Sequence, residues 1–343
     1  MIRERTWPRF AALVLLALAA LFAHGRAAAA VNLTCSATMT GLNFGTVAPN
    51  GAAVNATATL NYSCTYNGGL LSILDGVYAR LCFSIGTGSA GSGYAPRTMT
   101  STAGDTMNFQ MYTDLLHTNV WGGTGSGFTV PQAMVPFTVL SVGATQSGTL
   151  TLYGQVPAGQ AALGAGSYLS HFNAANTQLT YAYNEALLSL GTYPTTCTSG
   201  SSGNGTGTFP FDVSATVLPS CTLSGASDMG FGSVPSNFSG NLSASSTITM
   251  NCVYRTSWQV GLDNGQNATG STRRMIRAGN TVTYELYRDS AGTLRWGNTL
   301  NTDTAVGAGT GTAQSLTVFG RVQPQSGLGA GTYSDRITVT VTY

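Results

Sequence analysis

The 343-residue sequence contains no lysine and few charged residues of any kind. Its 14 basic side chains are all arginine, 12 side chains are acidic, and charged residues make up 8% of the chain, about a third of the ~25% usual in soluble domains. This composition excludes a charged disordered tail and a basic nucleic-acid-binding domain. The 44 glycines show no Gly-X-Y period, which excludes collagen. Abundant Gly, Thr, Ser and Asn disfavour long helices, so an all-β protein with room for two domains is indicated.

Residues 1–30 have the pattern of a cleavable export signal. Arg3, Arg5 and Arg9 precede an apolar run over residues 11–23, and alanines follow at 28–30, which is the order of a secretory signal peptide. The run is shorter than the ~20 residues that a membrane-spanning helix needs. We therefore expect an exported mature chain that starts near Val31. That chain is close to neutral, which disfavours binding to nucleic acid.

Cysteine is scarce, and all six cysteines lie in the exported part. An even number in an oxidising compartment predicts three disulfides. Two pairs have nearly the same spacing, Cys35 with Cys64 and Cys221 with Cys252, and by elimination Cys82 pairs with Cys197. No CxxC motif or Cys/His cluster has the spacing of a metal site. We expect no metal and no cofactor.

The two similar cysteine pairs belong to an internal repeat. Each pair encloses a Phe-Gly, Phe44-Gly45 in one case and Phe231-Gly232 in the other. Further matches follow in the same order: 109–114 with 284–289, Trp121 with Trp296, 150–154 with 316–320, and 164–168 with 329–333. So many ordered matches indicate a duplicated domain. Short alternating runs separated by Gly- and Asn-rich turns predict two tandem immunoglobulin-like β-sandwiches, at 31–205 and 206–343.

Each copy resembles the spore coat protein U domain. The Cys pair around Phe-Gly, the Tyr-x-x-Tyr-x-Asp and Trp-Gly block, the Gly-x-Gly-x-Tyr turn and the terminal Thr-Val-Thr-Tyr carry the resemblance. The second copy fits more closely than the first, where Ser170 stands in place of Asp335. The family includes subunits of archaic chaperone–usher pili, and two such domains in one chain resemble the two-domain tip adhesins of Csu-type pili.

The resemblance implies an incomplete fold whose last strand comes from a neighbouring subunit. It implies as partners a periplasmic chaperone, an outer-membrane usher and the next pilin subunit, and a location at the pilus tip on the cell surface. The second domain would then lack its final strand. Its groove for a chaperone or donor strand would include Ile337, Val339, Val341 and Tyr343, which alternate along the terminal run.

A donor-like segment lies inside the chain. Residues 198–208 contain only Thr, Ser, Gly and Asn, a flexible linker composition. In the following segment, 209–218, Phe211, Val213, Ala215 and Val217 alternate with polar residues. We expect this segment to complete the first domain in cis; the alternative is an ordinary first strand of the second domain.

The expected mature N-terminus offers no comparable segment. Only four residues, 31–34, precede Cys35, too few for a strand of normal length. A subunit that receives a strand and donates none would occupy one end of a polymer. We therefore expect this chain at the pilus tip.

The first copy carries three apolar insertions that the second lacks. They are expected to converge at the end of the first domain far from the second and to bind an abiotic or host surface. The candidate surface-binding residues are Leu70, Leu71, Ile73, Leu74, Phe128, Val130, Leu187, Leu188, Leu190 and Tyr193. The alternative for Leu70, Leu71, Ile73 and Leu74 is that they lie in a loop packed on its own core, as an ordinary satellite.

These features favour an adhesive tip subunit that mediates surface attachment and biofilm formation. The other candidate is a structural spore-coat or extracellular-matrix protein without a binding site. No enzyme is expected: Asp114 and Asp289 recur at one repeat position, which favours a structural hydrogen bond. Trp121 and Trp296 are predicted core residues. The cluster of Arg273, Arg274 and Arg277 is interpreted as a solvated turn or a contact with an anionic partner.

Overall fold

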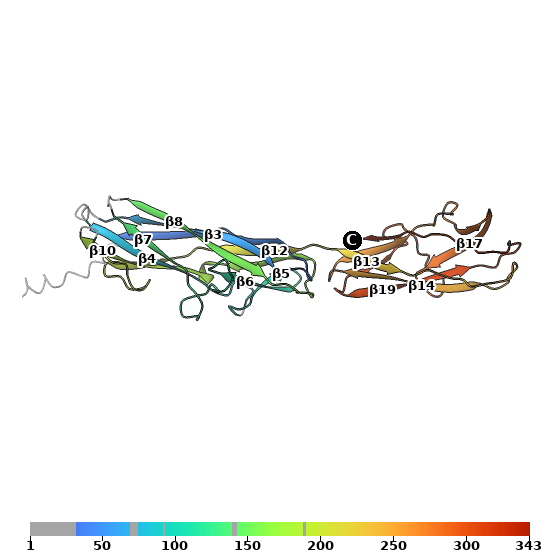
Figure 1. Cartoon of the computed structure of the whole chain (residues 1–343), viewed down its shortest axis with the longest axis horizontal. Helices are drawn as coiled ribbons and strands as arrows, with labels where there is room; N and C mark the ends of the chain where they lie inside the picture. The colour runs from blue at the N-terminus through green and yellow to red at the C-terminus, as the bar shows by residue number, and fades with distance from the viewer. Residues whose placement is uncertain (1–31, 69–74, 92, 139–142, 188–189) are drawn as a thin grey trace, which may run out of the picture.

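The computed structural model describes residues 32–343 except 69–74, 92, 139–142 and 188–189. Strands dominate this part of the chain, and the one helical element among the described residues is the short 3-10 turn η2 (Ala174–Asn176). Two β-sandwiches follow one another along the chain and lie end to end (Figure 1). The all-β, two-sandwich prediction is confirmed.

The first sandwich has one sheet of eight strands and one of four. The larger sheet has the order β1 (Leu33–Met39), β3 (Val54–Tyr66), β8 (Thr145–Val156), β6 (Thr106–Tyr112), β5 (Arg97–Ser101), β9 (Gly166–Phe172), β12 (Phe211–Val217) and β2 (Leu42–Thr46). The smaller sheet has the order β11 (Gly203–Gly207), β10 (Thr177–Leu187), β4 (Asp75–Ile85) and β7 (Gln132–Phe137).

The second sandwich repeats this plan with fewer strands. Its larger sheet has the order β13 (Cys221–Ala226), β14 (Leu242–Cys252), β19 (Ala313–Val322), β17 (Asn280–Tyr287) and β16 (Arg273–Arg277). Its smaller sheet has the order β18 (Ala305–Ala308), β15 (Ser257–Leu262) and β20 (Val339–Thr342).

Two-residue alternation places the apolar side chains between the sheets. In β12, Phe211, Val213, Ala215 and Val217 are buried, and the residues between them are more exposed. Each sandwich has a separate apolar cluster, with Trp121 in one and Trp296 in the other. Both tryptophans are core residues, as predicted.

Three disulfides staple the strands. Cys35–Cys64 joins facing residues of β1 and β3, and Cys221–Cys252 joins facing residues of β13 and β14. The third, Cys82–Cys197, ties β4 to the segment that follows β10. The cysteines therefore pair as their spacing suggests.

The expected flexible linker at 198–208 is partly a strand. β11 pairs with β10 from Leu179↔Gly207 to Tyr183↔Gly203. The rings of Tyr181 and Tyr183 lie over Gly205 and Gly203, where a Cβ atom would have no room. The glycines that suggested flexibility are thus needed for close packing, and strands of the first sandwich continue as far as Val217.

The sandwiches touch at the turn before β9. The Ala165 N–H donates to the Tyr254 carbonyl at 3.0 Å, and Arg255 pairs with Asp105 at 3.2 Å. The opposite end of the first sandwich, to the left in Figure 1, carries the start of β4 and the end of β10, where Asp75 faces Leu187.

Candidate functional site

The two sandwiches share their internal geometry, which allows their edges to be compared position by position. The indole N–H of Trp121 donates to the Phe83 carbonyl at 2.8 Å, and that of Trp296 donates to the Val260 carbonyl at the same distance. The Tyr168 hydroxyl donates to the Gly164 carbonyl, and Tyr333 does the same to Gly329. Counting from these tyrosines, Asp335 corresponds to Ser170.

In the first sandwich, β12 occupies the space between β9 and β2. It runs antiparallel to β9, with Val213 facing Ser170, and parallel to β2, with Val213 facing Leu42. The rings of Phe209 and Phe211 stack parallel to the indole of Trp121, with centroids 6.2 Å apart in each case. Residues 209–217 are thus part of the first core.

In the second sandwich, no described strand lies at the corresponding place. Ser334 pairs with Ile276 on one side, but among the described residues no backbone hydrogen bond joins Tyr333, Asp335 or Ile337 to a neighbour on the other side. We call this segment, 333–337, the open edge. Its side chains alternate between half-buried and exposed.

The facing segment of the second sandwich is also uncovered. Met229 and Phe231 both lie against Gly320, as Leu42 and Phe44 lie against Gly154 in the first sandwich. Leu42 and Phe44 are buried, whereas Met229 and Phe231 are only half-buried. Apolar side chains flank the gap on both sides.

The four predicted groove residues differ in their positions. Ile337 lies in the open edge itself, while Val339 and Val341 belong to β20, which pairs with β15. All three are half-buried and pack against the second core. Tyr343 is more exposed than the others, at 58%.

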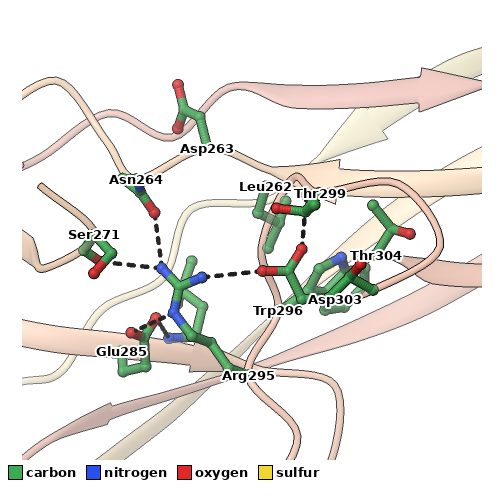
Figure 2. A network of polar contacts seen from close by, with 12 residues as sticks. Leu262, Asp263, Asn264, Ser271, Glu285, Arg295, Trp296, Thr299, Asp303 and Thr304 are labelled. Carbon is green, nitrogen blue, oxygen red and sulfur yellow. Dashed lines mark hydrogen bonds and ion pairs between the residues drawn. The ribbon is translucent and has the colours of Figure 1, made fainter.

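A polar network fixes the second sandwich beside Trp296 (Figure 2). Arg295 lies between Glu285 and Asp303, pairing with them at 2.8 and 3.3 Å, and also donates to Asn264 and Ser271. Such a network holds strands in one arrangement because its charged members are also hydrogen-bonded.

The arginine cluster expected to be a solvated turn contains a buried member. Arg273 is fully buried, pairs with Glu285, and donates to the carbonyls of Leu262, Asp263 and Trp296. Burial lowers its pKa, and Glu285 opposes that change. The interpretation as a solvated turn is wrong for Arg273, because carbonyls and a carboxylate replace its water.

Arg97 occupies the same position in the first sandwich, where no carboxylate among the described residues pairs with it. It donates to Gln110 Oε1 at 2.6 Å and to the Trp121 carbonyl at 2.6 Å. Burial lowers the pKa of Arg97 to about 10. These arginines support the fold in both copies.

Asp114 and Asp289 cap equivalent hairpin loops. Asp114 accepts from the Thr118 hydroxyl and from the backbone of Thr118 and Asn119. Asp289 accepts the same set from Thr293 and Leu294. Their predicted structural role is confirmed.

The second apolar insertion does not lie wholly at the same end of the first sandwich as the other two. Asp75, which follows the first insertion, faces Leu187 at the start of the third. The second insertion leads into β7 beside Cys82, and the Pro131 carbonyl accepts from Phe83. The distance from Asp75 to Phe83 along β4 is roughly 25 Å, at about 3.3 Å per residue of strand. The predicted convergence is wrong for Phe128 and Val130, because they precede β7 at the Phe83 end of β4, whereas Phe137 at the end of β7 faces Val77.

Several candidate surface residues fall outside the described part of the chain. Leu70, Leu71, Ile73, Leu74 and Leu188 lie in the undescribed segments, and of Leu187 only the backbone is described. Leu190 is 83% exposed. Tyr193 is half-buried with its ring 5.4 Å from that of Tyr78.

The second insertion is only moderately exposed. Phe128 is 39% exposed and packs against Tyr94, with ring centroids 5.6 Å apart. Val130 is half-buried. Part of this insertion therefore packs against the first sandwich and is not freely exposed.

Two exposed leucines were missed in the sequence. Leu115 and Leu116 are 69% and 81% exposed on the hairpin that Asp114 caps. The corresponding residues of the second copy are Ser290 and Ala291. A comparison of the repeats within this matched block, rather than of insertions alone, would have found them.

Neither a metal site nor a membrane helix is found in the part of the chain that the structure describes. No group of three or more His, Cys, Asp or Glu side chains there could hold a metal ion. No helix in the same residues has the length and apolarity needed to cross a membrane.

The spore coat protein U domain matches the chain twice, over residues 21–175 and 207–340. The chain belongs to the spore coat protein U family. The two matches correspond to the two copies of the repeat, and the second match begins before β12 and ends within β20. Among the curated proteins none matches the chain.

The chain is similar to several solved structures of pilus proteins. One is the CsuC–CsuE chaperone–tip adhesion subunit pre-assembly complex from archaic chaperone–usher Csu pili of Acinetobacter baumannii, at 17% identity over 90% of this chain and 100% of that chain, with a TM-score of 0.42. Another is the CupB6 tip adhesin from Pseudomonas aeruginosa, at 11% identity over 90% and 94%, with a TM-score of 0.36. A third is a chaperone–tip adhesin complex of CFA/I fimbriae biogenesis, at 11% identity over 88% and 95%, with a TM-score of 0.29.

Proposed function

We propose that this spore coat protein U family member is an adhesive tip subunit of a chaperone–usher pilus. Its second domain joins it to the fibre by accepting a strand at the open edge, and its first domain attaches to surfaces. It passes through the periplasm to the cell surface with a periplasmic chaperone and an outer-membrane usher as partners. The proposed domains are the adhesin at 31–205 and the pilin domain at 206–343, with 209–218 acting as a donor-like strand in cis.

One observation carries the assembly part of the proposal. The same space holds β12 in the first sandwich and no described strand in the second. The unpaired backbone N–H and C=O groups of such an edge, beside half-buried apolar side chains, can bind a strand of another chain. A donor strand there would hydrogen-bond to the open edge and cover Met229, Phe231 and Ile337.

The adhesive part rests on exposed apolar side chains of the first domain. Leu190 extends from the end that faces away from the second domain, where Asp75 and Leu187 bring the first and third insertions together. Leu115 and Leu116 form a second exposed pair. Apolar contact is non-directional and is worth about 1.5–3 kcal/mol for each large side chain that is fully buried. Such contacts suit attachment to a range of surfaces, including plastic, during biofilm formation.

Attachment of cells that carry sequence variants of the full chain tests the proposal. The far-end variant combines Leu71→Ser, in the first insertion, with Leu190→Ser, in the third. The hairpin variant combines Leu115→Ser with Leu116→Ser. Leu300→Ser is the matched control, because Leu300 is a 47% exposed leucine of the second domain. Attachment to polystyrene and the number of pili are measured together.

We expect the far-end variant to lose most attachment at normal pilus number and the control to keep it. Unchanged attachment by both first-domain variants would reject the adhesive role and favour a structural coat or matrix protein. Lost pili would mean that the altered residues serve the fold. Immunogold labelling of the first domain along the fibre, rather than at its end, would reject the tip position.

A further inference from the structure

Asp335 introduces a carboxylate where the filled edge of the first sandwich has a hydroxyl. Ser170, its counterpart, is fully buried beside β12, and its Oγ has no hydrogen-bond partner among the described residues. The residue facing Ser170 is Val213, whose side chain cannot form a hydrogen bond. A buried hydroxyl without a hydrogen-bond partner lowers the stability of the fold modestly, but a buried carboxylate that faces an aliphatic side chain lowers it far more.

The second sandwich is built to hold the Asp335 side chain inward. Asp335 Oδ2 accepts from the Tyr284 hydroxyl at 2.7 Å, and Oδ1 accepts from the Asn267 N–H at 3.1 Å and from Asn267 Nδ2 at 2.9 Å. Gly265 makes room for the carboxylate, because a Cβ at that position would collide with Oδ2. Burial and the hydrogen bond to Asp335 raise the pKa of Tyr284, which keeps the phenol protonated as a donor.

These contacts leave the carboxylate partly unsatisfied. A carboxylate offers about four acceptor positions, and three bonds are present, with one of them on Oδ2. No ion pair to Asp335 occurs within the described residues. Directly facing residues of an antiparallel pair have Cβ atoms about 4.5–5.5 Å apart, within reach of a short hydroxyl side chain.

We propose that Asp335 determines which strand the second domain accepts: the residue facing it carries a serine or threonine hydroxyl that donates to the free acceptor position. The register follows from β12, where Phe211, Val213 and Ala215 face Phe172, Ser170 and Tyr168. The accepted strand runs antiparallel to the open edge, with apolar side chains opposite Ile337 and Tyr333. This inference rests on the proposed function, since it assumes that the open edge accepts a strand.

Strands fused to the full mature chain test this assignment. A flexible linker and a copy of residues 209–218 follow Tyr343, and the copy has either Val or Thr at the position of Val213. Val and Thr have nearly the same shape and differ in the hydroxyl. Each version is made with Asp335 and with Asp335→Ser, and the melting temperature of the second domain is measured by calorimetry and by hydrogen exchange of β14.

We expect the Thr version to melt several degrees higher than the Val version with Asp335, and this preference to vanish or reverse with Asp335→Ser. Asp335→Asn provides the same comparison if the serine variant does not fold. A Ser→Val change at the outward position of Ser214 in the copy is the control and should show no dependence on residue 335. Equal stabilisation by both versions in every background would overturn the role of Asp335 while leaving the acceptor edge intact. Stabilisation by neither version would overturn the proposed function as well.

Discussion

Val213 of β12 lies directly opposite Ser170 of β9, whereas Asp335, at the same place in the second sandwich, faces no described strand. One chain therefore shows the same edge in a filled and an open form. The filled form gives the direction and register that an added strand would take. The open form leaves apolar side chains half-buried that the first sandwich buries.

The strand β12 should be essential to the stability of the first domain. Val213 is fully buried, so Val213→Asp places an unpaired charge in the core and should cost at least about 4 kcal/mol. Asp212→Ala is the control on the same strand, because Asp212 is exposed and its pairing with His171 is a surface contact, worth about 0–1 kcal/mol. Urea unfolding of both variants measures the difference. A first domain unaffected by Val213→Asp would show that β12 is not part of its core.

Removing the long-range disulfide should weaken the first domain alone. Cys82 and Cys197 are 115 residues apart, and closing a loop of that size stabilises by about 4–5 kcal/mol on the chain-entropy model. Cys82→Ala with Cys197→Ala should therefore lower the first thermal transition and leave the second unchanged. Calorimetry of the mature chain resolves the two. An equal shift of both transitions would contradict the separate cores.

Glu285 and Arg295 should be energetically coupled. Either Glu285→Gln or Arg295→Val removes the ion pair at 2.8 Å. The first change also leaves the buried Arg273 without its carboxylate, and the second leaves Asp303 without its arginine, so each should cost about 1–3 kcal/mol. The double variant restores the pair found in the first copy, Gln110 and Val120. It should cost less than the two single changes added together. Strict additivity in urea unfolding would show that the network of Figure 2 does not act as a unit.

The capped hairpins should loosen in acid. The Thr118 hydroxyl and neighbouring amides lower the pKa of Asp114, and the Leu294 amide and Thr293 lower that of Asp289. Because the folded pKa lies below the unfolded value of about 3.9, the stabilisation is present above about pH 4 and is lost as the pH falls through the folded pKa.

Amide resonances of Thr118 and Leu294, followed by NMR from pH 6 to pH 2, measure this titration. Asp114→Asn and Asp289→Asn, which cannot titrate, serve as controls. Midpoints at or above the ordinary carboxyl value would refute the capping role.

Much of the fold could be predicted because it is local or repeated. Alternation identifies β12, and the repeat aligns Trp121 with Trp296. The cysteine spacings suggest two of the bridges, and elimination gives the third. The strand β11 was not predicted, because a glycine-rich composition on its own indicates a flexible linker. In the structure, Gly205 and Gly203 lack the side chains that would collide with the rings of Tyr181 and Tyr183. Amino-acid composition does not show which aromatic ring packs against which stretch of glycine backbone.

The candidate site was harder to predict because it depends on strand direction. The three insertions of the first copy suggested a single apolar surface patch. However, β7 runs antiparallel to β4, so Phe128, which precedes β7, lies at the opposite end of β4 from Asp75. The burial of Arg273 likewise depends on carbonyls of Leu262 and Trp296 that are distant in sequence. Ser170 and Asp335 were noticed as a difference between the copies, and only the register of β12 gives that difference a meaning.

The melting temperature of the second domain, with and without an added strand, tests the central claim most directly. The mature chain is compared with the same chain carrying a linker and residues 209–218 after Tyr343, with the first domain as the internal reference. Covering Met229, Phe231, Tyr333 and Ile337 should raise the second transition by at least about 10 °C and leave the first unchanged. A second transition that does not move would contradict an acceptor edge in this domain.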